Sequence, residues 1–219
     1  MEDRTRRASY VALWIFAVSF GWTEAATVVY LRATSPSVPG PFVGLQFPFV
    51  LISGRLLAAE VVREAATILI LGTVAWLAGR RRADRVGAFL LAFGVWDLVY
   101  YLVLRLISGW PNSLTDPDIL FLIPWPWVGP VWAPMLVAAI FVAGGSYLYW
   151  SPNQGRWYTA SDVALLTTSA AAIVSSFLVD WHAVTAGELP LNFRPGLYWI
   201  ALVLGTGWFV RIERRRLLR

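Results

Sequence analysis

The chain has 219 residues, of which 58% are hydrophobic and only 14% are charged, and its mean hydropathy is +0.61. These values lie outside the range of soluble globular domains and exclude a water-soluble fold. The formal net charge of +5 would indicate a nucleic-acid partner in a soluble protein. Here the positions of the arginines have a topological explanation, so we expect no nucleic-acid binding.

Six apolar segments, taken in chain order, are each long enough to cross the ~30 Å hydrocarbon core of a bilayer as a helix. They cover residues 10–32, 57–78, 86–107, 128–149, 161–182 and 194–212. The sequence therefore predicts an all-α fold: a polytopic integral membrane protein with about six transmembrane helices, forming a single domain over residues 1–219.

Two connections are long and rich in proline, which removes a backbone donor and fixes φ. Residues 33–55 predict an extended loop on the outer side of the membrane. Residues 108–130 also carry several tryptophans, a residue enriched at membrane interfaces. The apolar piece at 118–123 is too short to span, so it either lies flat in an interfacial aromatic belt or dips into the membrane as a lid.

The arginines are distributed unequally between the two sides of the membrane. Thirteen of the 18 basic residues fall at the two termini and in the connections that would share their side. These are Arg4, Arg6, Arg7, Arg80, Arg81, Arg82, Arg85, Arg156, Arg211, Arg214, Arg215, Arg216 and Arg219. Cytoplasmic segments are enriched in basic residues, and an even number of spans puts both ends on one side. We predict a multi-pass protein of the cell (inner) membrane with both termini cytoplasmic.

Two residue types are absent from the chain. All 18 basic side chains are arginine, so no lysine is present to hold retinal or pyridoxal as a Schiff base. The lack of cysteine excludes disulfides, thiolate metal sites and cysteine nucleophiles. The use of arginine in place of lysine is most simply explained by a GC-rich bacterial or archaeal genome.

Several acids lie inside the predicted spans. At ~1.5 Å per residue, Glu24, Glu64 and Asp97 share a layer roughly 10–15 Å from the outer ends of three different helices. Glu60 and Asp180 lie nearer the outer surface. Each acid in hydrocarbon costs about 2.5–3.5 kcal/mol, so a partner, water or a cation must compensate it.

Polar neighbours surround these acids along the chain. Arg63 lies beside Glu60 and Glu64, while Tyr101 and Arg105 share the helical face of Asp97. The fifth span ends with Asp180 and the only histidine, His182, and Tyr198 opens the sixth. These positions predict one polar pocket that opens outward. The candidate catalytic residues are Glu64, Asp97, Glu24, His182 and Asp180. The candidate substrate-binding residues are Arg63, Glu60, Tyr101, Arg105 and Tyr198.

Three interpretations of this cluster stay open. In the first it is a structural ion-pair network, with Arg63 between Glu24 and Glu64 and with Arg105 near Asp97. In the second it is the site of a membrane enzyme or binding protein for a lipid-like or quinone-like molecule, with Glu64 or Asp97 as general base. In the third it serves a proton- or cation-coupled transporter or an accessory protein. The nearly apolar cytoplasmic halves of the spans argue against a transport path. The sequence predicts contact with the lipid bilayer and leaves the oligomeric state open.

A divalent cation is one way to balance the excess of acids. Carboxylates with one imidazole suit Mg²⁺, Mn²⁺, Ca²⁺ or iron better than copper. The candidate metal ligands are Glu24, Glu64, Asp97 and His182.

Overall fold

The structure is a computed structural model, and it describes residues 2–34, 54–151, 158–186 and 193–217. The predicted outer loop at 33–55 lies almost entirely outside these residues. Six described helices are long and apolar enough to cross a membrane, which confirms the predicted all-α polytopic fold. They are α1 (Glu2–Thr34), α2 (Gly54–Ala78), α3 (Arg82–Ser108), α4 (Trp132–Trp150), α5 (Ala160–Phe177) and α7 (Pro195–Leu217), and a short helix α6 (Trp181–Thr185) follows α5.

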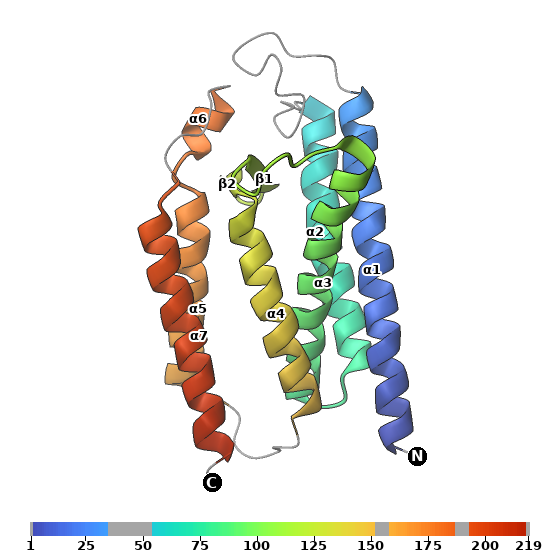
Figure 1. Cartoon of the computed structure of the whole chain (residues 1–219), viewed down its shortest axis with the longest axis vertical. Helices are drawn as coiled ribbons and strands as arrows, with labels where there is room; N and C mark the ends of the chain where they lie inside the picture. Colours follow the sequence, from blue (N-terminus) through green and yellow to red (C-terminus); the bar gives the residue numbers. More distant parts are fainter. Residues whose placement is uncertain (1, 35–53, 152–157, 187–192, 218–219) are drawn as a thin grey trace.

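The long helices run side by side, and α1 begins at the same end of the molecule as α7 ends (Figure 1). We call this the basic end, because Arg4, Arg6, Arg81 and Arg214 lie there. The opposite end carries the hairpin described next, and we call it the hairpin end. The shared end agrees with an even number of spans.

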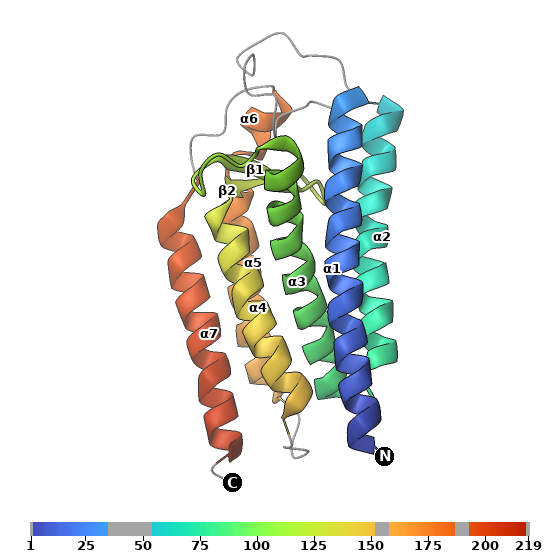
Figure 2. The same cartoon turned by 45° about the vertical axis from the view of Figure 1, so that its right-hand side comes forward.

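Residues 117–130 form a β-hairpin, which the sequence had suggested only as a flat or dipping apolar piece. Strand β1 (Pro117–Phe121) pairs antiparallel with β2 (Trp127–Pro130), with Asp118 opposite Gly129. Figure 2 shows that α1 and α2 extend past the level of this hairpin. The predicted fourth span therefore starts late, at Trp132, because residues 127–130 are paired as a strand.

The fifth helix is also shorter than predicted. α5 begins with a capping box in which Thr159 and Asp162 bind each other's backbone N–H groups. It ends at Phe177, where the N–H of Leu178 reaches back to Val174 O and Ser175 O. Asp180 and His182 therefore do not belong to the spanning helix, as the sequence had suggested, but to the start of the separate helix α6.

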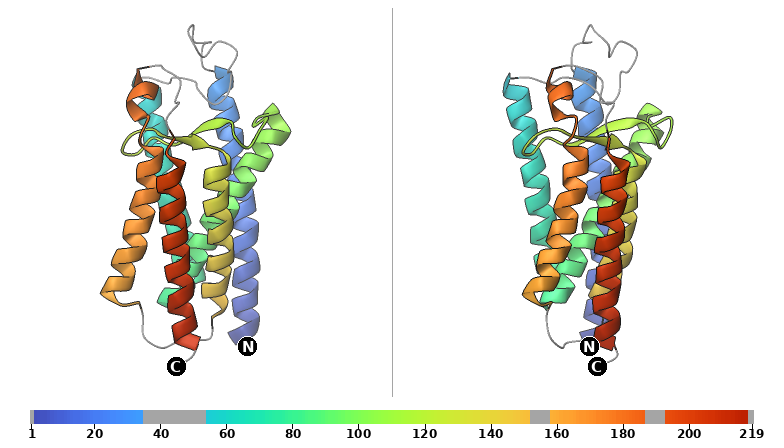
Figure 3. Two further views of the ribbon diagram at one scale, coloured as in Figure 1. Left: turned by 60° about the vertical axis from the view of Figure 1, so that its left-hand side comes forward. Right: turned by 90° about the vertical axis from the view of Figure 1, so that its left-hand side faces the viewer.

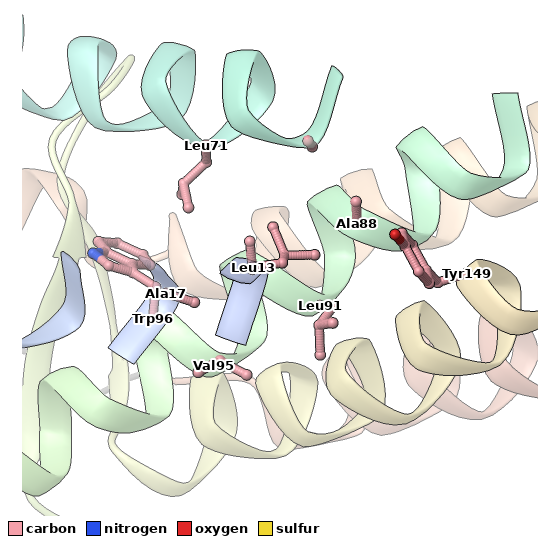
Figure 4. Packing of buried hydrophobic residues seen from close by; sticks show 10 residues of the cluster. Leu13, Ala17, Leu71, Ala88, Leu91, Val95, Trp96 and Tyr149 are labelled. Atoms are coloured by element: carbon pink, nitrogen blue, oxygen red, sulfur yellow. The ribbon is translucent and has the colours of Figure 1, made fainter. Parts of the chain in front are cut away.

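Glycine allows α3 and α4 to pack closely. A Cβ at Gly94 would lie 2.4 Å from the carbonyl oxygen of Ala138, and one at Gly145 would lie 2.5 Å from the backbone nitrogen of Leu91. Small residues that bring backbones together are the usual means of helix association in membranes. On its other side α3 packs against α1 and α2 through buried residues that include Leu13, Leu71 and Trp96 (Figure 4).

The α5 and α7 helices pack mainly on each other and lie side by side (Figure 3). Figure 1 shows this pair set apart from α1, α2 and α3. Aromatic contacts join α7 to α4 at both ends. At the hairpin end Trp132 meets Tyr198, with ring centroids 5.2 Å apart, and at the basic end Tyr147 meets Phe209 at 6.4 Å. Between these two contacts the helices enclose space, and the candidate site lies there.

Buried acids at the basic end are paired with arginines, and one of these ion pairs joins α1 to α3. Asp84 on α3 accepts from Arg6 on α1 and from Arg81, each at 3.2 Å. On α7, Glu213 accepts a hydrogen bond of 2.7 Å from Arg216 and one of 2.8 Å from the Tyr158 hydroxyl. Burial, together with this bond to Glu213, raises the pKa of Tyr158 above its ordinary value.

Candidate intramembrane binding site

A cavity of about 520 Å³ lies between the α5–α7 pair and helices α2, α3 and α4. This volume is in the range of small-molecule sites. Over most of its length the wall is apolar, and the residues there come from α4, α5 and α7. They include Val137, Ile140, Phe141, Ile173, Val174, Leu202 and Phe209.

Polar side chains gather at one end of the cavity, where α1, α2 and α3 meet strand β1. The acids there are Glu24, Glu60, Glu64, Asp97 and Asp118, and the other polar groups are Arg63, Thr67, Tyr100 and Tyr101. Arg63 is the only basic side chain among the described residues that line the cavity. The site is therefore rich in carboxyl groups and poor in cations.

Arg63 is fully engaged with two of these acids. Its Nη1 lies 2.5 Å from Glu24 Oε1, and its Nε and Nη2 hold both oxygens of Glu60 at 2.8 and 2.6 Å. Two-point pairing of this kind is the strong form of an arginine–carboxylate contact. The predicted pair of Arg63 with Glu24 is present. The predicted pairing of Arg63 with Glu64 was wrong. Glu60, three residues before Arg63, is the acid on the same helical face.

Glu64 binds the hairpin instead of an arginine. Its Oε2 accepts a hydrogen bond of 2.8 Å from the backbone N–H of Leu122, just after strand β1. The residue is only 8% exposed, and no ion pair or further hydrogen bond of Glu64 joins it to another described side chain. This carboxyl group therefore holds the hairpin against α2 with one oxygen, and the other oxygen has no hydrogen bond to a described residue.

Asp97 lines the cavity, and one of its carboxyl oxygens has no hydrogen-bond partner among the described residues. Its Oδ2 is buried and has no hydrogen bond to any part of the chain that the structure describes. The predicted pairing with Arg105 was wrong, since Arg105 is exposed and donates to Gly109 O and, at 3.3 Å, to Asn112 Oδ1. Helix α3 ends at Ser108 with Gly109 as its C-cap, and the long Arg105 side chain turns to this helix end and not down to Asp97.

Asp118 is an acid of the site that the sequence analysis did not select. It is fully buried, accepts from the Tyr101 hydroxyl at 2.9 Å and from the Ile119 N–H at 2.8 Å, and lines the cavity. A usable signal was present, because a single acid inside an apolar piece flanked by prolines is unusual. Its position depends on the hairpin, which brings residue 118 back to α3.

Three other predicted site residues lie away from the cavity wall. Asp180 and His182 belong to the α6 segment, where the imidazole lies against the neighbouring Trp181 ring in a tilted arrangement. The hydroxyl of Tyr198 donates to Ala133 O at 2.7 Å inside the aromatic junction between α4 and α7. Six of the predicted site residues thus line the cavity in the described structure: Glu24, Glu60, Arg63, Glu64, Asp97 and Tyr101. The other four, Arg105, Asp180, His182 and Tyr198, are not among the described residues that line it.

The four candidate metal ligands do not fit a shared ion. Within the described ranges, no three or more His, Asp or Glu side chains are arranged so that they could hold a metal. The physical reasons are that Glu24 is taken by Arg63 and that His182 lies in α6, outside the cavity.

Comparison of the chain with protein-family models, with curated proteins and with solved structures gave no match in any of the three. The function must therefore be inferred from the cavity and the groups that line it.

Proposed function

We propose that this protein binds a lipid-like small molecule inside the membrane. The apolar body of the ligand lies between α4, α5 and α7, and its polar head lies among the carboxyl groups beneath the hairpin. One observation carries the proposal: a cavity of about 520 Å³ is apolar along most of its wall and has the cation-free carboxyl groups of Glu64 and Asp97 at one end.

A purely structural network accounts for only part of this arrangement. Arg63 balances Glu24 and Glu60, and these three residues suffice to join α1 to α2. Asp97 is not needed for that purpose, and an unpartnered carboxyl oxygen is costly in a buried site. Ionisable side chains that remain inside a membrane despite this energetic cost are typically functional.

The same groups support an enzyme as well as a carrier or receptor. Glu64 or Asp97 is placed to accept a proton or hydrogen bond from a bound head group, which is the role of a general base. A transport path has less support. Beyond the acids, the described wall offers only Thr67, Ser169 and Thr206 as hydroxyl groups toward the basic end, which is too little to lead ions or protons across.

We further infer that the hairpin end faces outward and the basic end faces the cytoplasm, in the inner membrane of a bacterium. The support is the excess of arginine at the basic end. The ligand head would then lie in the outer half of the bilayer.

Filling the cavity tests the proposal. The probes are three amphiphiles with the same decyl chain and different heads: 4-decylphenol, decylammonium and decyl phosphate. Binding to the purified protein in nanodiscs is followed by tryptophan fluorescence, since Trp96 and Trp127 line the cavity. We expect at least one probe to bind saturably to the wild type and to bind at least tenfold more weakly to Val137→Trp.

The matched control is Val203→Trp, which adds the same ring to a lipid-facing position of α7 that is 64% exposed. This variant should bind as the wild type does. If no probe binds, or if Val137→Trp binds as tightly as Val203→Trp, the proposed function is rejected.

A further inference from the structure

We propose that the head group bound in this cavity is a cation of the ammonium class, and that the Glu64 carboxylate is its counter-ion. The ligand is then a lipid-like amine whose apolar body lies along α4, α5 and α7. This inference rests on the proposed function, and it names the chemistry of the ligand for that site.

Glu64 supplies an acceptor that a ligand can reach. Its Oε2 is held by the Leu122 N–H at 2.8 Å, and its Oε1 has no hydrogen bond to a described residue. The residue is 8% exposed and lines the cavity, yet Oε1 is not one of the enclosed side-chain atoms that lack a partner among the described residues. An ammonium N–H can therefore donate to Oε1 while Leu122 keeps its bond to the other oxygen.

The charges around Glu64 favour a cation. Glu60 lies one helical turn before Glu64 on the same face of α2, and Arg63 already holds Glu60 and Glu24. Three carboxyl groups therefore share one guanidinium, and the described cavity wall as a whole carries five acids and one arginine. Acids inside a membrane normally have a partner, because an uncompensated carboxylate there is costly. A bound ammonium supplies the positive charge that this end of the cavity lacks.

The two other kinds of head group satisfy the site less well. A phosphate would bring further negative charge to the carboxyl groups, and the one arginine of the described wall is already engaged. A neutral hydroxyl can donate to Glu64, but it leaves the charge of the carboxylate unbalanced. Only the ammonium both donates to Glu64 and offsets its charge.

Aromatic rings at the same end of the cavity give a second, independent reason to expect a cation. Phe121 on β1 directly precedes Leu122, and its ring centroid lies 6.4 Å from those of Phe93 and Trp96 and 5.3 Å from that of Trp127. All four rings line the cavity. The face of an aromatic ring attracts an ammonium group and repels an anion.

The head-group series and Glu64→Gln test this proposal together, in nanodiscs of zwitterionic lipid that do not themselves attract cations. Glutamine removes the charge and keeps an oxygen for the Leu122 N–H. We expect decylammonium to bind the wild type most tightly of the three probes, and to bind Glu64→Gln at least tenfold more weakly. The binding of 4-decylphenol should be the same for both proteins.

The matched control is Asp116→Asn, the same carboxyl-to-amide change at a described residue that does not line the cavity. This variant should bind decylammonium as the wild type does. A fourth probe, N-decylacetamide, has the same chain with an uncharged nitrogen, and it should bind the wild type at least tenfold more weakly than decylammonium.

Other outcomes separate this inference from the proposed function. If 4-decylphenol or decyl phosphate binds best, or if Glu64→Gln binds decylammonium as tightly as the wild type, the head-group assignment is wrong while the cavity remains a ligand site. If no probe binds, the proposed function itself fails. Should Glu64→Gln not fold, the comparison with N-decylacetamide decides: equal affinity for the charged and uncharged probes would overturn the assignment.

Discussion

At the scale of single residues, the acids of the cavity fall into two groups. Glu24 and Glu60 are ion-paired with Arg63, whereas Glu64 and Asp97 have no cationic partner among the described side chains. Removing one partner of a buried pair is expensive because the other charge remains buried. The two groups should therefore respond differently to neutral substitutions.

We expect Arg63→Gln to lower the free energy of unfolding by about 3 kcal/mol, because two carboxylates lose their only cation. Glu64→Gln should leave the stability unchanged, since the amide oxygen can still accept from the Leu122 N–H. Asp97→Asn should leave it unchanged or raise it. Melting temperatures in one detergent measure all three. Equal losses in the three variants would show that Glu64 and Asp97 are structural as well.

The sequence was sufficient to find most of these acids but not all of their partners. Counting residues along the spans placed Glu24, Glu64 and Asp97 in one layer, and the structure puts all three on one cavity. The prediction of Glu64 and not Glu60 as the partner of Arg63 was wrong because neighbours at i+1 on a helix do not face each other. The direction of Arg105 was not predictable, because it depends on the helix end at Gly109.

At the scale of secondary structure elements, the spanning helices were predictable and the hairpin was not. Runs of about twenty apolar residues have one stable form in a membrane, since a helix satisfies its own backbone groups. A short apolar run such as 118–123 has no such constraint, and its length cannot distinguish strand from helix. The hairpin forms because its two strands pair with each other and because Glu64 and Phe177 hold it from two sides.

Close packing of α3 on α4 gives a prediction for glycine. A Cβ at Gly94 would lie 2.4 Å from a backbone oxygen of α4, so Gly94→Ala must push the helices apart. We expect a loss of about 1–3 kcal/mol, as in other overpacked interiors. Gly72→Ala is the control, because a Cβ there meets nothing within 4 Å. Its melting temperature should be unchanged or slightly higher, whereas a fall equal to that of Gly94→Ala would contradict the proposed cause.

At the scale of the whole molecule, orientation follows from the sum of the charges. A reporter that is active only in the cytoplasm should be active when it is fused after Arg219. A reporter that is active only outside the cytoplasm should be active when it is inserted at Ser37. The reason is the arginine excess at the basic end, which cytoplasmic segments favour. A cytoplasmic signal from Ser37, which lies outside the described residues, would reverse the molecule and place the ligand head in the inner half of the bilayer.

The arrangement of helices also gives the cavity a side that faces lipid. Aromatic contacts close the seam between α4 and α7, but no hydrogen bond, ion pair or ring contact joins α2 to α5 among the described residues. Ala170 on α5 is exposed and also lines the cavity. The hairpin lies over one end of the cavity, so we predict that a ligand dissolved in the bilayer would enter between α2 and α5.

A single engineered cysteine can test this route, since the chain has none of its own. Ala170→Cys, labelled in detergent with a bulky maleimide and then reconstituted, should bind decylammonium at least tenfold more weakly than the unlabelled variant, because the label blocks the passage and the adjoining wall. Val203→Cys, labelled in the same way on the lipid-facing side of α7, should bind normally. If labelling at residue 170 leaves both the affinity and the association rate of decylammonium unchanged, the ligand does not enter between α2 and α5.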